Sequence, residues 1–348
     1  MIKLFTLVDY NKWDEIVRSF KIYDVYYLSG YARAFEQNGD GKAVLIYFEK
    51  EDTRAINVVM KRDIADCDEF KTEIEQDKFF DFVTPYGYGG WIVEGEDYCS
   101  LKEEYEQFAR RNGIVSEFVR FHPMIRNWEN LGNIYEESFH GKTIFIDTSS
   151  EEAIWNNFTS QNRGKVRKAK KNGLKVYWSR DDRILDEFLD IYSETMDKDC
   201  AKDYYYFDRD FFESVMEDLK YNAMWFYAMK DDEMASAGVF LFSNGQMHYH
   251  LSGSRRKYQS LAPVNLLLYE ASLWACHAGY KTLHLGGGVG AQEDNLYVFK
   301  KSFNRYQDAE FHTGKKVFNP QIYQKLVDIR YRRQKEKTED TFFPAYRA

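Results

Sequence analysis

AMWFYAMKDDEMASAGVFLFSNGQMHYHLSG, residues 223–253, contains three apolar, aromatic-rich segments separated by short polar turns at 231–233 and 243–245. Segments of this length that are bounded by turn residues are typical of β-strands. Because such short turns connect neighbouring antiparallel strands, the stretch predicts a three-stranded antiparallel sheet.

The residues that follow predict a helix and then one more strand. Pro263 suits the first position of a helix, and Gly279 is a good left-handed cap for a helix that ends near Ala278. The strand-like segment YKTLHLGG, residues 280–287, comes next. Since a helix separates it from the preceding strand, we expect the two strands to be parallel, which makes the sheet mixed and the fold class α/β.

The first half of the chain repeats this order in a weaker form. YEQFARRNGIVSEFVRFHP (residues 105–123) and YEASLWACHAGYKTLHLGG (residues 269–287) share a pattern of helix, glycine and strand. Two copies are too few for a solenoid, so we predict two α/β domains in tandem. The first is expected to comprise residues 1–146, completed by a C-terminal helix within 317–348, and the second residues 147–316.

Composition restricts the class of protein. The net charge of −8 argues against general nucleic-acid binding, although it leaves room for a local basic patch. The four cysteines stand far apart and form no C-x-x-C pair, which favours the reduced thiols of the cytoplasm. No secretion signal and no membrane-spanning run is visible, so we expect a soluble cytoplasmic protein. The 18% of aromatic residues fits either a large aromatic core or a long binding groove.

Three consecutive glycines, Gly286 to Gly288, follow the last strand of the second domain. The segment lacks the third glycine of a G-x-G-x-x-G fingerprint and the Gly-Lys-Ser/Thr of a Walker A loop, so it does not predict a nucleotide loop. Glycines at the C-terminal end of a strand allow a substrate to approach the backbone, and parallel strands bind ligands at such ends. We therefore expect this segment to form the floor of an active site.

The order of strands, turn, helix and strand resembles that of acyl-CoA N-acyltransferases of the GNAT type. That resemblance implies a loop whose backbone N–H groups, together with the helix dipole, hold the pyrophosphate of CoA. The loop usually reads R/Q-x-x-G-x-G/A, whereas RRKYQSLAPV, residues 255–264, has no glycine. The side chains of Gln259, Ser260 and Leu261 would crowd a pyrophosphate held against the backbone.

Two GNAT-like units with an altered loop resemble the FemABX family of peptidoglycan-bridge aminoacyltransferases. Three segments carry this resemblance: a basic helix that leads into the second domain (QNRGKVRKAKKNGLKV, residues 161–176), a Tyr/Gly loop of the first domain (TPYGYGGWIV, residues 84–93) and a closing stretch (DNLYVFKKSF, residues 294–303). The likeness spans roughly residues 79–303, without the coiled-coil insertion of longer members. A related branch of acetyltransferases shares these segments together with the GGG motif.

The resemblance implies a catalytic pair in the closing stretch. Phe299 and Lys300 would lie beside the acyl donor, and Lys300 would stabilise the negative charge that develops on the attacked carbonyl. The alternative is a solvent-exposed lysine on a helix whose phenylalanines are buried. Lys301, one position further along, is expected to be solvent-exposed.

Other residues are candidates for substrate binding. Tyr86, Tyr88 and Gly89 would line the acceptor groove, or else form an ordinary turn. His250 is either a base in the cleft or a buried, hydrogen-bonded histidine. The remaining candidates are Lys198, Tyr205, Arg255, Tyr258 and Gly287. No metal site is predicted, because His248 and His250 have no further ligands at recognisable spacing.

Residues 163–175 carry seven cations and no acid, which indicates contact with charged tRNA or a phosphorylated precursor, or else a solvated helix face. We predict an acyl- or aminoacyltransferase without a tightly bound cofactor, which acts on a primary amine. The favoured reaction is the aminoacyl-tRNA-dependent addition of an amino acid to a peptidoglycan precursor of the cell wall. Acyl-CoA-dependent N-acylation of an amino sugar or amine is the alternative, and a catalytically silent binding protein is a third.

Overall fold

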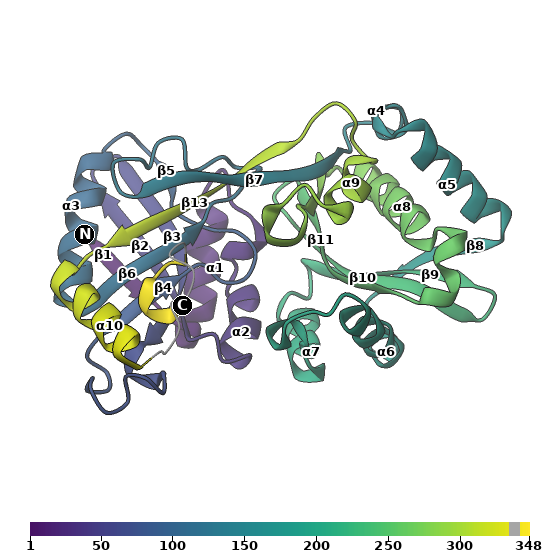
Figure 1. Ribbon diagram of the computed structural model, residues 1–348. Helices are drawn as coiled ribbons and strands as arrows, with labels where there is room; N and C mark the ends of the chain where they lie inside the picture. Colours follow the sequence, from purple (N-terminus) through teal and green to yellow (C-terminus); the bar gives the residue numbers. More distant parts are fainter. Residues whose placement is uncertain (334–341) are drawn as a thin grey trace. The chain divides into compact units, whose positions relative to one another are not determined.

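The computed structural model describes residues 1–333 and 342–348, and the chain divides into two compact units. Unit 1 consists of residues 1–140 and 311–348, and unit 2 of residues 141–310. Each unit is a sheet with helices packed against it, as Figure 1 shows.

The chain passes between the units within two long strands, β7 (Glu136–Asp147) and β13 (Ala309–Val317). The domain borders expected from the sequence, after residues 146 and 316, lie inside the same two strands. Helix α10 (Pro320–Arg333) belongs to unit 1. The rest of the expected helical tail lies partly on residues 334–341, outside the described residues, and Phe342 to Pro344 are not helical.

Unit 1 is built on a mixed sheet. Its other elements are β1 (Ile2–Phe5), α1 (Tyr10–Ser19), α2 (Ser29–Gln37), β2 (Lys42–Lys50), β3 (Thr53–Asp63), β4 (Phe80–Val83), β5 (Ile92–Glu94), α3 (Tyr98–Arg111) and β6 (Ile114–Arg120). The strand order is β1-β2-β3-β4-β6-β13, with β5 paired to β3. β4 and β6 run parallel, and the chain between them contains α3.

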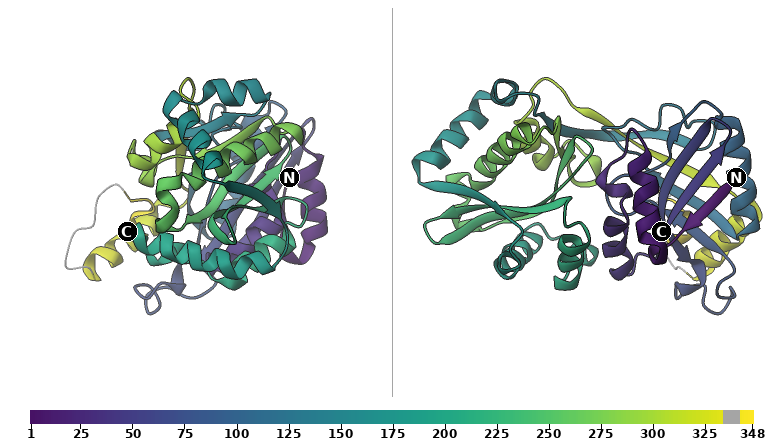
Figure 2. Two further views of the ribbon diagram at one scale, coloured as in Figure 1. Left: turned by 90° about the vertical axis from the view of Figure 1, so that its right-hand side faces the viewer. Right: turned by 180° about the vertical axis from the view of Figure 1, so that it is seen from behind.

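Unit 2 has its own mixed sheet, which includes β7. Its other elements are α4 (Glu151–Asn157), α5 (Ser160–Lys171), β8 (Leu174–Ser179), α6 (Arg183–Lys198), α7 (Arg209–Asp218), β9 (Ala223–Lys230), β10 (Glu233–Ser243), β11 (Gln246–Ser254), α8 (Pro263–His277), β12 (Thr282–Gly286) and α9 (Asn295–Lys301). The strand order is β7-β12-β11-β10-β9-β8. Figures 1 and 2 show α5 and α8 on one face of this sheet and α6 and α7 on the other.

The predicted arrangement of unit 2 is confirmed. β9, β10 and β11 are antiparallel neighbours, α8 follows them, and β12 pairs with β11 in parallel. This parallel pairing covers three residue pairs, of which the last joins His248 to His284. β11 continues beyond His248 to Ser254, so the two strands part at their C-terminal ends.

The predicted repeat of helix, glycine and strand is present in both units. Gly113 has a φ of +69° between α3 and β6, and Gly279 has a φ of +85° between α8 and β12. A residue with a side chain is disfavoured at such angles, which explains glycine at both helix ends. The fold is therefore mixed α/β with two units of the same construction.

One local detail differs from the sequence pattern. The motif S-x-x-E at Ser149 predicts a capping box that starts α4. Instead Ser150 is the N-cap, and its Oγ accepts the N–H of Ala153 at 3.0 Å. The N–H of Ser149 is donated to the Asp147 carboxylate at 2.9 Å, which holds Ser149 in the preceding turn.

The C-terminal residues are anchored in unit 1. Asp81 is fully buried, and its carboxylate lies 2.6 Å from Arg62 Nε and 2.5 Å from Arg347 Nε. The hydroxyl of Tyr346 donates to the same carboxylate at 3.0 Å and lies 2.8 Å from the Ser116 hydroxyl. Since a buried carboxylate is stable only when it is paired, these last residues are part of the unit 1 core.

The longest helix among residues 1–333 and 342–348 is α6, with 16 residues. Within these ranges no helix combines the length and the apolar character that a membrane crossing requires.

Candidate active site

The glycine segment lies where β11 and β12 part. Gly286, the last residue of β12, has a φ of +76° and turns the chain into a loop that leads to α9. Gly290 in this loop also has a positive φ, of 58°. We call residues 286–294 the glycine loop. It places Gly287, a predicted substrate-binding residue, next to Lys300.

Lys300 points back from α9 to the glycine loop. Its Nζ donates to the carbonyl of Gly287 at 2.7 Å. Among the described residues this carbonyl is the only hydrogen-bond partner of the Lys300 ammonium, so two of its three N–H donors remain for a ligand. Lys300 is half-buried, and burial lowers its pKa to about 8, although the negative charge of Asp294 acts in the opposite direction. The ammonium is therefore mostly protonated at neutral pH.

The neighbours of Lys300 on α9 serve different roles. Phe299 packs against the core of unit 2, and its ring contacts the buried Phe303 edge-on at 5.3 Å between centroids. Lys301 is not simply exposed, as the sequence predicted. Its Nζ donates to the Gln307 carbonyl at 2.9 Å and to the Asp308 carboxylate at 3.2 Å. The chain after α9 folds back toward Lys301, and a helix pattern alone does not contain this contact.

His250 lies on β11 beyond the last parallel pair with β12. It is half-buried, and burial, reinforced by the charge of His248, lowers its pKa to about 3. At neutral pH the imidazole is therefore uncharged and only weakly basic. This argues for a binding role of His250 rather than for a base that removes a proton.

Several groups of the segment before α8 face acids. Arg255 lies 3.7 Å from Glu187 and 3.8 Å from Glu194, and the backbone N–H of Arg256 is donated to Glu194 at 2.8 Å. The hydroxyl of Tyr258 donates to the carboxylate of Glu233. Arg255 and Tyr258, the two predicted substrate-binding residues of this segment, therefore already face carboxylates.

The candidates at the end of α6 and after it are exposed or half-buried. Lys198 ends α6, and its Nζ lies 3.2 Å from the carboxylate of the adjacent Asp199. Tyr205 is half-buried, and its carbonyl accepts the Tyr192 hydroxyl at 2.7 Å. The assignment of both residues to substrate binding stays a prediction.

The Tyr/Gly loop of unit 1 is held by two side chains that the sequence pattern did not single out. Arg120 Nη2 donates to the Thr84 carbonyl at 2.6 Å and to the Pro85 carbonyl at 2.8 Å. Asn127 Nδ2 donates to the Gly89 carbonyl at 2.9 Å. Arg120 ends β6 and Asn127 lies in the turns after it, and a polar residue at such a position is too common to be informative.

Within this loop Gly89 is buried and Tyr86 and Tyr88 are half-buried. The Tyr88 ring contacts Tyr26 and Phe311 edge-on, with centroids 5.7 Å and 5.4 Å away. Burial and, as a smaller effect, the neighbouring Tyr86 raise the pKa of Tyr88 above its usual value. Tyr88 is thus a neutral aromatic surface with a hydroxyl, as an acceptor groove requires.

The basic segment forms α5 and the start of β8. Lys165, Lys168, Lys171 and Lys175 are exposed and have no acid within 4 Å among the described residues; we call them the cationic stripe. Lys170, by contrast, pairs with Glu270 at 2.7 Å. The stripe is a surface of positive charge that the protein itself does not neutralise.

Helix α5 is connected to the closing helix through buried amides. Asn265 Nδ2 on α8 donates to Asn162 Oδ1 on α5 at 2.7 Å, and Asn162 Nδ2 donates to the Ser302 carbonyl after α9 at 3.3 Å. The orientation of the stripe is therefore fixed relative to the segment that carries Lys300.

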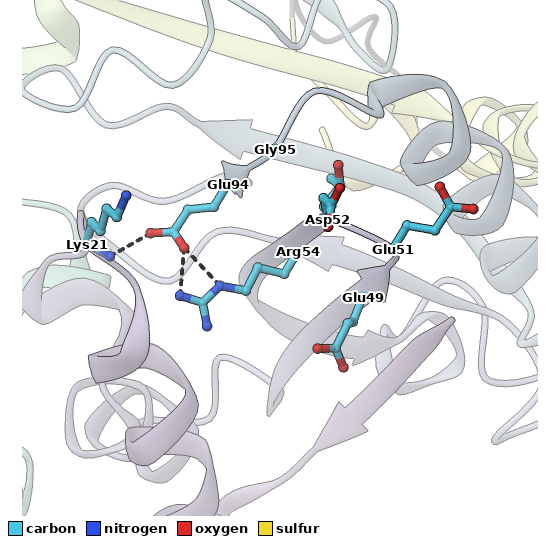
Figure 3. Close-up of a pocket in the computed structure, with 8 residues that line it drawn as sticks. Lys21, Glu49, Glu51, Asp52, Arg54, Glu94 and Gly95 are labelled. Atoms are coloured by element: carbon cyan, nitrogen blue, oxygen red, sulfur yellow. Dashed lines mark hydrogen bonds and ion pairs between the residues drawn. The ribbon is translucent and has the colours of Figure 1, made fainter.

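A surface cavity of about 440 Å³ lies elsewhere, in unit 1 (Figure 3). Glu94 in its wall accepts from Arg54 Nη2 at 2.6 Å and from the Lys21 N–H at 2.6 Å. Its other lining residues are Glu49, Glu51, Asp52, Thr53 and Gly95. None of the predicted site residues lines it, so we do not assign the reaction to this cavity.

Residues 156–301, which lie in unit 2, match the family model of the acetyltransferase (GNAT) domain. No curated protein matches the chain. Three solved structures show the extent of the fold similarity. They are FemX (TM-score 0.68, 14% identity, 93% of this chain and 99% of that chain), a conserved protein of unknown function from Bacteroides thetaiotaomicron (0.59, 10%, 91% and 100%) and L-PGS from Bacillus licheniformis (0.50, 11%, 86% and 91%). Residues 156–301 therefore carry a GNAT acetyltransferase domain, and the fold of the whole chain is similar to that of FemX.

Proposed function

We propose that this protein transfers an aminoacyl group from a charged tRNA to the primary amine of a peptidoglycan precursor, and that Lys300 stabilises the transition state. The observation that carries the proposal is the position of Lys300. Its ammonium is anchored by one hydrogen bond to Gly287, and two N–H donors remain at the parting of β11 and β12. The fold similarity to FemX supports this class of reaction.

In this reaction the acceptor amine attacks the ester carbonyl of the donor. A C–N bond forms, the carbonyl oxygen becomes an oxyanion, and the ester C–O bond then breaks to release the ribose hydroxyl. The amine proton passes to the leaving oxygen through water or a substrate group. A cation that hydrogen-bonds the oxyanion lowers this barrier without moving a proton itself, and Lys300 is suited to that role.

Two features favour a tRNA donor over CoA. The segment before α8 has no glycine, and its Arg256 N–H and the side chains of Arg255 and Tyr258 are engaged by carboxylates. A CoA pyrophosphate placed there would meet these negative charges. The cationic stripe, by contrast, matches a polyanion, because binding of nucleic acid is driven by cations that replace its counterions.

A CoA-dependent N-acyltransferase acting on an amino sugar or amine is the second candidate. The observation that favours it is the match of unit 2 to the GNAT acetyltransferase domain. The same position of Lys300 would then stabilise the oxyanion formed from a thioester.

Transfer assays with Lys300→Ala test the proposal. Purified protein is supplied with aminoacyl-tRNA and an amine-bearing muropeptide precursor, and in parallel with acetyl-CoA. We expect transfer from tRNA, and a loss of about 100-fold or more in kcat for Lys300→Ala. Lys301→Ala is the matched control, because its side chain contacts only Gln307 and Asp308 among the described residues. Undiminished activity of Lys300→Ala would exclude this role, and activity with acetyl-CoA alone would favour the second candidate.

A further inference from the structure

One carboxylate ties the glycine loop to the start of α9. Asp294 is the N-cap of α9, and its Oδ1 accepts the N–H of Tyr297 at 2.9 Å. Its Oδ2 accepts the N–H of Val289 at 3.0 Å. Because Val289 belongs to the loop and Tyr297 to the helix, a single side chain fixes both parts of the segment that carries Lys300.

The glycines leave room for this carboxylate. A Cβ at Gly288 would lie 2.3 Å from Asp294 Oδ1 and 2.1 Å from the Gln292 carbonyl oxygen. A Cβ at Gly287 would lie 2.7 Å from the Lys142 carbonyl oxygen on β7. Such distances are far shorter than a normal contact, so any side chain at these positions would push the loop away from Asp294 and from β7. The glycines therefore have a packing role besides the approach of a substrate.

Asp294 is also the carboxylate that acts electrostatically on Lys300. Burial raises the pKa of Asp294, but the backbone N–H bonds of Tyr297, Val289 and Leu296, together with the charge of Lys300, outweigh this, and the pKa is lowered overall. It is therefore ionised at neutral pH.

The other charged groups around α9 are engaged with one another. Lys142 lies 3.6 Å from Glu293 and 3.9 Å from Asp308, and Lys301 lies 3.2 Å from Asp308. Among the described residues, it is the charge of Asp294 that opposes the effect of burial and raises the pKa of Lys300.

We propose that Asp294 is the positioning residue for Lys300: it fixes the loop whose Gly287 carbonyl holds the ammonium, and its negative charge acts on that ammonium. The inference deepens the proposed function and rests on it for the kinetic part of its test. Asp294 acts through Lys300 and does not itself contact the reacting atoms.

The charge state of Lys300 can be measured without any substrate. Lysines are reductively methylated with ¹³C-formaldehyde, the Lys300 signal is identified by its loss in Lys300→Arg, and its chemical shift is followed with pH. Asp294→Asn removes the charge at nearly constant size, and the pKa of Lys300 should fall by about one unit, since a nearby carboxylate favours the ammonium. Asp208→Asn is the matched control, because Asp208 caps α7 in the same way, accepting the Phe211 N–H at 3.0 Å.

Transfer kinetics then test the positioning role. In Asp294→Asn we expect a lower kcat with a nearly unchanged KM, and an alkaline limb of the kcat profile that moves to lower pH with the Lys300 signal. Asp294→Ser retains a cap for Tyr297 without the charge and should shift the Lys300 pKa equally. An identical Lys300 pKa in wild type and Asp294→Asn would overturn the inference. A shifted Lys300 pKa in a protein whose Lys300→Ala variant retains full transfer activity would instead support the link to Asp294 and refute the proposed function.

Discussion

Glu117 on β6 allows a test of the unit 1 core that is independent of any substrate. Its side chain is 1% exposed, and its carboxylate accepts the hydroxyls of Tyr105 and Tyr135 at 2.8 and 2.9 Å. The other oxygen accepts Asn57 Nδ2 at 2.9 Å. Burial raises the pKa of this carboxyl from 4.5 to about 7, even though these hydrogen bonds and the charge of Lys316 act to lower it.

The direction of the effect on stability follows from this pKa. Because the folded pKa lies above the unfolded one, the folded protein binds more protons between pH 4.5 and about 7, and stability falls as the pH rises through this window. The difference of 7 minus 4.5 corresponds to about 3 kcal/mol of unfolding free energy, lost when the pH exceeds the folded pKa.

Glu117→Gln removes this titration and keeps the shape of the side chain. The oxygen of Gln can accept both tyrosine hydroxyls, and its NH₂ group can meet the oxygen of a rotated Asn57 amide. We expect the wild type to lose about 2–3 kcal/mol relative to Glu117→Gln between about pH 5 and about pH 8, at constant salt concentration.

Urea denaturation of both proteins at several pH values measures this difference. Subtracting the variant from the wild type removes the contribution of every group that the two proteins share. Since two units need not unfold together, hydrogen exchange of the β6 amides assigns the transition to unit 1. If the two proteins show the same pH dependence, Glu117 is charged in the folded state at no cost and the reasoning is wrong.

Three other variants have defined outcomes. Arg347→Ala should destabilise unit 1 by about 3 kcal/mol in urea, because it removes a charged partner of the buried Asp81, and Asp81→Asn in the same background should recover part of the loss. Gly288→Ala should lower kcat by about 100-fold through displacement of the glycine loop. Gly164→Ala on α5 is the control: its added methyl group would have no neighbour within 4 Å, so kcat should be unchanged. Replacing three lysines of the cationic stripe by glutamine should weaken tRNA binding and reduce the slope of log K against log[salt] by about 2–3 in filter binding; an unchanged slope would place the tRNA elsewhere.

The architecture could be predicted from the sequence because its signals are local. The strands of 223–253 are bounded by turn residues, and α8 is bounded by Pro263 and Gly279. The same helix, glycine and strand pattern at 105–123 predicted the second copy. Each of these signals depends on a few neighbouring residues, so no knowledge of long-range contacts was needed.

The site could be predicted only in part, because its geometry depends on contacts between distant residues. The contact of Lys300 with Gly287 spans one loop; the resemblance of the closing stretch indicated Lys300, and the glycine triplet after the strand indicated Gly287. Arg120 and Asn127, however, hold a loop more than thirty positions earlier in the chain, and no local pattern contains that relation. The acids around Arg255 come from other elements for the same reason.

The charges of unit 2 bear on the choice of donor. In the segment before α8, carboxylates lie beside Arg255 and accept the Tyr258 hydroxyl, whereas the cationic stripe on α5 and β8 has no acid partner among the described residues. Phosphate binding at the segment before α8 would require breaking existing ion pairs. Phosphate binding at the cationic stripe would not. The buried amides of Asn162 and Asn265 hold α5 against α8 and against the chain after α9, so a polyanion on the stripe lies at a fixed position relative to Lys300. One unit can thus recognise the donor by its backbone charge and activate its carbonyl with a single half-buried cation at another place. A nucleic-acid donor requires these two tasks to be separate, whereas a compact CoA site does not.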